Sequence, residues 1–222
     1  MNDEPKRLEC IIASLSDSHI AEREFREDGT LNPITDFFAG SHLVAWLNKL
    51  RGRGLGAREK YLVLNGDIFD SQLVALLGEY EDPPLLSFAV YKIRRIINMQ
   101  TEIFDALKSL VDNGWTIVYT IGNHDAFIAW PRVQRELGMR IARNSPERLI
   151  FCDEMEIRGI LFRHLYEVEP FNTLPPPEDK FSRGYTVKFG KTKFWISEAL
   201  LPLVQKKTQK TETSNYTAHD DY

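Results

Sequence analysis

The stretch Tyr-Leu-Val-Leu-Asn-Gly-Asp-Ile-Phe-Asp, residues 61–70, decides the fold class. Its first four residues form an apolar run with the length of a buried strand, and polar residues follow at once. Two other segments repeat this order: residues 10–15 lead into Ser-Asp-Ser-His, and residues 116–121 lead into Gly-Asn-His-Asp. Three such strands with helical stretches between them predict an α/β domain.

The polar residues that follow the three strands are expected to meet. Open α/β sheets bind their ligands outside the carboxyl ends of the strands, along one edge of the sheet. The sequence therefore predicts one polar cluster, built from residues 16–19, 65–70 and 122–125.

A long segment with a helical pattern separates the second and third strands. Residues 85–110 carry apolar side chains at three- and four-residue intervals, with Lys92, Arg94 and Arg95 among them. The segment is either one long helix packed on the sheet or, in part, a lid over the site within residues 71–110. We interpret the three basic residues as an exposed helix face, with contact to a substrate phosphate as the alternative.

The remaining elements are shorter. Residues 35–50 and 130–137 have helical spacing, and residues 149–152 and 157–163 have strand composition. The second of these strands ends in His164, which adds an imidazole to the predicted cluster.

Composition bounds the class of protein. With 222 residues, 43% of them hydrophobic, the chain is long enough for one domain, which we place at residues 1–204, followed by a polar segment at 205–222. A net charge of −4 argues against a stable nucleic-acid partner but suits a small phosphorylated substrate. No apolar stretch has membrane-spanning length and no signal peptide is visible, so a cytoplasmic protein is expected.

Carboxylates, imidazoles and an amide follow the ends of four strands. They are Asp17, His19, Asp67, Asn123 and His164. Two closely spaced divalent cations require such ligands, one of them a bridging carboxylate, and Asp67 is assigned that role. Mn²⁺ is favoured by this mixed oxygen and nitrogen set, with Fe²⁺ and Zn²⁺ as alternatives. The competing interpretation is that Gly, Asp and Asn merely serve the turns, and that His164 is a hydrogen-bonded core residue.

Three of these motifs together resemble the calcineurin-like metallophosphoesterases. The motifs are Asp-Ser-His at 17–19, Gly-Asp-Ile-Phe-Asp at 66–70 and Gly-Asn-His-Asp at 122–125. His-Leu-Tyr at 164–166, with Glu-Pro-Phe-Asn at 169–172, is similar to the UDP-2,3-diacylglucosamine hydrolase-like branch. The resemblance implies a four-layer α/β/β/α sandwich. It also implies a hydrolase that cleaves a phosphomonoester, phosphodiester or pyrophosphate bond at a binuclear metal centre.

The resemblance also implies the ligand assignment: Asp17 and His19 on the first metal, Asp67 as the bridge, and Asn123 with His164 on the second.

The same resemblance assigns the catalytic residues. His124 would act as the general acid or stabilise the transition state, with Asp125 orienting its ring. Asp70 would contact a ligand side chain instead of the metal and would fix the tautomer of His19.

One motif of the resembled family, Gly-His-x-His, is absent from the 222 residues. It supplies one further imidazole to each metal in that family. We expect the chain to be an incomplete form that ends just before these ligands. The alternative is a catalytically impaired relative that keeps the fold as a binding scaffold. No pattern in the sequence indicates an oligomeric state.

Overall fold

The protein is described from a computed structural model that covers residues 8–22, 30, 37–54, 56–74 and 86–164, and the backbone of 184–189 and 192–197. The polar segment expected at 205–222 lies outside these residues.

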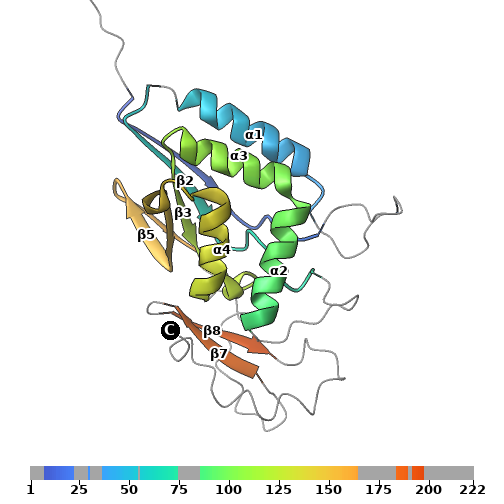
Figure 1. The fold of residues 1–222 in the computed structure, drawn as a ribbon. Coiled ribbons are helices and arrows are strands. Elements are labelled where there is room, and N and C mark those ends of the chain that lie inside the picture. The colour runs from blue at the N-terminus through green and yellow to red at the C-terminus, as the bar shows by residue number, and fades with distance from the viewer. Residues whose placement is uncertain are drawn as a thin grey trace, which may run out of the picture.

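Four parallel strands form the central sheet (Figure 1). They are β1 (Cys10–Leu15), β2 (Glu59–Asn65), β3 (Thr116–Thr120) and β4 (Leu149–Cys152), in the order β1-β2-β3-β4. The parallel sheet confirms the α/β class expected from the sequence. In the register of the sheet, Leu15 is opposite Leu64 and Asn65 is opposite Thr120. The first three strands therefore end at one level, so their polar loops begin side by side.

The helices lie along one face of this sheet (Figure 1). They are α1 (Gly40–Arg53), α2 (Leu86–Met99), α3 (Thr101–Asp112) and α4 (Pro131–Ile141), with a short 3-10 turn, η1 (Ala126–Ala129), before α4. α3 contacts both α1 and α4, while α2 packs against α4. α4 starts at a proline, whose fixed φ suits the first turn of a helix.

Of the two alternatives for residues 85–110, the single long helix is wrong, because α2 and α3 are separate helices that meet at Gln100. Gln100 has φ −108° and ψ 37°, outside the helical region. Its side chain donates to the carbonyls of Ala21 and Glu22, at 3.3 and 3.1 Å. The break thus lets the helical layer bind the loop that follows β1. A lid within residues 71–110 stays a prediction, and residues 75–85 are outside the described part of the chain.

A β-hairpin packs on the opposite face of the sheet. Its strands are β5 (Glu154–Ile157) and β6 (Ile160–Arg163), and β5 packs Ile157 against Val63 and Val118. The expected strand over 157–163 is wrong, because Arg158 and Gly159 form the hairpin turn, with φ of 52° and 79°. A second hairpin, β7 (Gly184–Phe189) and β8 (Thr192–Ser197), follows later in the chain. Among the described residues no helix is both long and apolar enough to span a bilayer.

Candidate metal centre

The chain segments that follow β1 and β2 run beside each other. The Asp17 amide donates to the Gly66 carbonyl at 3.1 Å, and the His19 amide donates to the Asp67 carbonyl at 3.0 Å. Ile20 extends this pairing through a bridge to the segment that ends at Asp70. The parallel pairing of the two strands thus continues into their loops and holds the predicted ligands of both loops together.

Three of the predicted ligands have left-handed backbone conformations. φ is 50° at Asp17, 46° at His19 and 53° at Asp67, a region that residues other than glycine enter at a cost of about 1 kcal/mol or more each. Such strain persists only where the surrounding structure enforces it, and it is concentrated at functional sites. Gly66, with φ 76°, allows the same turn without that cost.

One group of acid and imidazole side chains consists of Asp17, Asp67 and His164, whose ligand atoms all lie within 4.8 Å of one another. His164 Nδ1 lies 3.0 Å from the Asn65 carbonyl oxygen, so this nitrogen carries a proton and donates it. His164 Nε2 faces the Asp67 carboxylate at 3.2 Å. Burial opposes protonation of this ring, but the Asp67 carboxylate outweighs it and raises the pKa of His164 to about 9.

A second group consists of His19, Asp70 and His124, again with ligand atoms within 4.8 Å. One oxygen of Asp70 lies 3.1 Å from His19 Nδ1 and 3.0 Å from His124 Nδ1, and the two rings meet edge to face at 4.7 Å. Burial would raise the pKa of Asp70, but the hydrogen bonds from His124 and His19 lower it to about 2. With each Nδ1 held by Asp70, each Nε2 is left for a ligand. The expected contact of Asp70 with His19 is present.

Asp67 connects the two groups. One of its oxygens contacts His164, and the other accepts the backbone amide of His124 at 2.9 Å. Asn123 lies in the chain between Gly122 and His124 and is half-buried. A Cβ added at Gly122 would collide with the Asp67 side chain, so this loop packs closely against Asp67. The described part of the chain therefore brings the side chains of four predicted ligands, Asp17, His19, Asp67 and His164, to one edge of the sheet, with the fifth, Asn123, in the loop that carries His124.

The expected pairing of Asp125 with the His124 ring is wrong. Asp125 is fully buried, and its carboxylate accepts hydrogen bonds from the amides of Gly122 and Ile68 and from the Tyr119 hydroxyl, at 2.6, 2.9 and 2.6 Å. Burial raises the pKa of Asp125 to about 6, although the Tyr119 hydrogen bond opposes this. Asp125 therefore ties the loop after β3 to the loop after β2, while Asp70 holds the His124 ring.

Two glycines make room for the ligands. A Cβ at Gly66 would collide with the His164 ring, and a Cβ at Gly122 would collide with the Asp67 carboxylate and backbone. Such close approach of backbone to ligand side chains is what a compact metal site requires. The ligand types, the convergence and the close backbone approach all suit divalent cations, so each acid and imidazole group could hold a metal ion.

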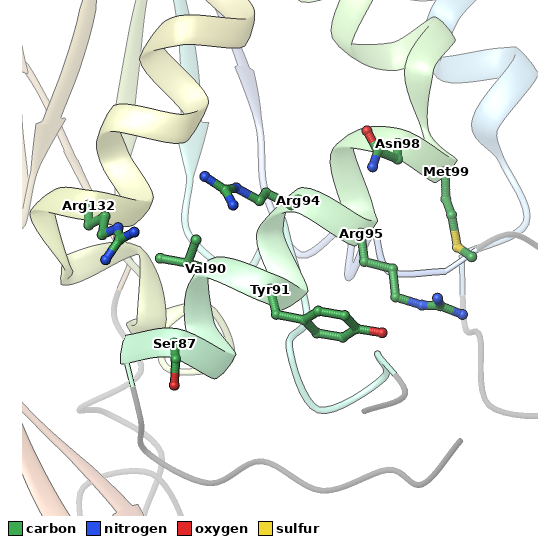
Figure 2. A pocket seen from close by; sticks show the side chains of 8 residues that line it. All are labelled: Ser87, Val90, Tyr91, Arg94, Arg95, Asn98, Met99 and Arg132. Carbon is green, nitrogen blue, oxygen red and sulfur yellow. The ribbon is translucent and has the colours of Figure 1, made fainter. Parts of the chain in front are cut away.

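The structure also corrects the expected basic face of α2. Lys92 is fully buried, whereas Arg94 is exposed and donates to Glu136 at 2.6 Å. Arg94, Arg95 and Arg132 line a groove of about 450 Å³, and Figure 2 shows Arg94 and Arg132 reaching into the space between α2 and α4 from opposite sides. Arg95 binds Glu22, three residues beyond His19.

Sequence reasoning missed three contributors to the centre. The Asn65 carbonyl orients His164, the Tyr119 hydroxyl holds Asp125, and Lys92 donates to the carbonyl next to Asp70. A phenol inside an otherwise apolar strand was a usable signal for Tyr119, because a buried hydroxyl needs a partner. A backbone carbonyl carries no such signal.

The sequence matches no protein-family model and no curated protein at a significant level. The assignment of this centre therefore depends on the geometry and chemistry of its residues.

Proposed function

We propose that the chain is a metal-dependent phosphoesterase that hydrolyses a phosphomonoester, phosphodiester or pyrophosphate bond through a binuclear metal centre. The observation that carries the proposal is the meeting of two acid and imidazole groups at one edge of the parallel sheet, linked by Asp67. The motif resemblance supports it. The matching proposal for the fold is the four-layer α/β/β/α sandwich of the calcineurin-like metallophosphoesterases.

The residues that we assign to the two cations, following the motif resemblance, are Asp17 and His19 on one side, Asn123 and His164 on the other, and Asp67 between them. In the structure, Asp17 and Asp67 lie with His164, whereas His19 lies with Asp70 and His124. Mn²⁺ fits this set of oxygen and nitrogen ligands without thiolate, and Fe²⁺ or Zn²⁺ are alternatives. When bound, two divalent cations supply positive charge beside a phosphoryl group and activate a water molecule for attack.

His124 is the residue we assign to acid catalysis. Its Nδ1 contacts Asp70, which fixes the plane of the ring and leaves Nε2 for the substrate. A ring held in this way can deliver a proton to the leaving oxygen without losing its orientation. Asp125 serves the reaction indirectly, because its carboxylate holds the amides of the two loops that carry Asp67 and His124.

The substrate follows from the same chemistry. A phosphoryl group brings negative charge to the edge of the sheet, where the bound cations would neutralise it. The remainder of the substrate would be small, since the chain has an overall charge of −4 and would not hold a polyanion by charge alone.

Calorimetric titration with Mn²⁺, combined with hydrolysis of p-nitrophenyl phosphate and bis(p-nitrophenyl) phosphate, tests the proposal. Asp67→Asn is expected to weaken Mn²⁺ binding and hydrolysis together. His124→Gln is expected to retain Mn²⁺ binding and to lose about 10²–10⁴-fold in rate. His42→Gln is the matched control, because His42 is exposed on α1. Mn²⁺ binding without hydrolysis of any phosphoester would instead favour a binding scaffold, and absence of Mn²⁺ binding would overturn the metal centre itself.

A further inference from the structure

Lys92 of α2 is fully buried, which is rare for lysine because desolvating an ammonium group is costly. Its Nζ donates to the backbone carbonyl of Ser71 at 2.7 Å. An apolar side chain would fill this position on α2 without that cost, as Ile93 and Ile96 do on the same helix. The amine is therefore best explained by what it holds.

The carbonyl that Lys92 binds belongs to the turn that presents Asp70. Ser71 follows Asp70 directly, and both are almost fully buried. The Val74 amide also donates to the Ser71 carbonyl, at 3.2 Å, and the Gln72 amide donates to Asp70 Oδ1 at 2.9 Å. Residues 70–74 thus form a compact turn that is hydrogen-bonded internally and is tied to α2 by the Lys92 side chain.

The other oxygen of Asp70 holds the two imidazoles. Asp70 Oδ2 lies within 3.1 Å of His19 Nδ1 and 3.0 Å of His124 Nδ1. A displacement of the turn would move one carboxylate oxygen that two rings share, and both rings would lose their orientation together. The Lys92 ammonium contacts this turn from α2, directly next to the shared carboxylate.

We propose that Lys92 is a positioning residue of the metal centre: by holding the Ser71 carbonyl, it sets the Asp70 carboxylate beneath His19 and His124. Its effect on hydrolysis rests on the proposed function, whereas its effect on the two imidazoles does not. The same helix binds the first ligand loop through Arg95 and Glu22, at 2.5 Å. α2 thereby fixes the loops of β1 and β2 relative to each other.

The test compares Lys92→Met, which removes the ammonium at similar length, with Lys92→Arg, which keeps a cationic donor. Ile96→Val is the matched control, because Ile96 is equally buried one turn along α2. The first measurement is the long-range ¹H–¹⁵N spectrum of the histidine rings without metal. Mn²⁺ affinity and the kcat and KM of phosphoester hydrolysis follow.

Lys92→Met is expected to change the Nδ1 signals of His19 and His124 and to leave those of His164 in place, because His164 is held by Asn65 and Asp67. We expect Mn²⁺ affinity or kcat to fall about tenfold, with KM nearly unchanged and with Lys92→Arg restoring most of the loss. If Lys92→Met does not fold, Lys92→Gln, which keeps a neutral donor, is compared with Lys92→Arg in the same spectra.

His19 and His124 signals in folded Lys92→Met, or in Lys92→Gln where Lys92→Met does not fold, that match those of Ile96→Val would overturn the proposal. Changes in the His19 and His124 signals in a chain that hydrolyses no phosphoester would support Lys92 as a positioning residue while refuting the proposed function. The two failures are therefore distinguishable.

Discussion

Replacing Asp70 by asparagine keeps the shape of the side chain and removes the charge that two histidines share. The pKa of this carboxyl falls from 3.8 to about 2 in the folded protein. At about 1.4 kcal/mol per pKa unit, that difference corresponds to about 2 kcal/mol of stability. The side chain is only 4% exposed, so solvent screening reduces the value little. Because the pKa is lowered on folding, this stability is present above pH 3.8 and is lost as the pH falls toward 2.

Urea unfolding followed by circular dichroism at pH 5–6, with a chelator present, measures the effect. Both histidines have raised pKa values, so they carry charge in this range and depend most on Asp70. Asp70→Asn is expected to lower the free energy of unfolding by about 2 kcal/mol, and by less at higher pH, once the two rings have lost their protons.

Asp105→Asn is the matched control. Asp105 also accepts a hydrogen bond from a cationic side chain, Arg140, but is 68% exposed, and such surface pairs contribute about 0–1 kcal/mol. Equal losses of stability in Asp70→Asn and Asp105→Asn at pH 5–6 would refute the reasoning, because the shared carboxylate would then behave as an ordinary surface acid.

Three other perturbations have expected outcomes. Gly122→Ala is expected to cost about 1–3 kcal/mol in urea unfolding and to weaken Mn²⁺ binding in calorimetry, because its Cβ would collide with Asp67. Gly138→Ala, in an open position on α4, should be neutral or stabilising, and a similar loss in both variants would contradict the steric explanation. Tyr119→Phe removes a buried donor and is expected to cost about 1–3 kcal/mol in thermal or urea unfolding; an unchanged stability would show that the hydrogen bond to the buried carboxylate is not formed. The pKa of His164 rises to about 9 on folding, so protonated His164 stabilises the fold. With a chelator present, the difference in unfolding free energy between wild type and His164→Gln should be largest below pH 6.5 and should decline by up to about 3 kcal/mol toward pH 9. A difference that does not change with pH would contradict the contact with Asp67.

The local part of this centre could be predicted from the sequence. An apolar run followed by polar residues specifies both a parallel strand and the edge at which its polar side chains appear. The strands β1, β2 and β3 and the loops that follow them could therefore be predicted, while the five metal ligands stay a prediction. The burial of Lys92 was also readable: it lies at helical spacing with Ala89 and Ile96, both of which are buried. The charge of Lys92 favours an exposed position, whereas its helical spacing with the apolar residues indicates a buried one, and the spacing is the better guide here.

The partners of His124 and Asp125 could not be predicted in this way. Adjacency in the chain suggested Asp125 for His124, but neighbouring side chains leave the backbone in different directions, and Asp125 is satisfied by two amides and a phenol. Only the tertiary structure brings Asp70, from another loop, to the His124 ring. The helix break at Gln100 has no glycine or proline to mark it, and its side chain is satisfied by a loop about 80 residues earlier.

The left-handed conformations of Asp17, His19 and Asp67 have a consequence for protein engineering. At each of these positions a glycine would relieve backbone strain, so the substitutions that remove these proposed ligands are also substitutions that the backbone tolerates well. A library selected only for heat resistance is therefore expected to lose these three proposed metal ligands early, and a sequence optimised for folding alone would keep the same sheet without them. Selection on this protein must include metal binding as a separate criterion.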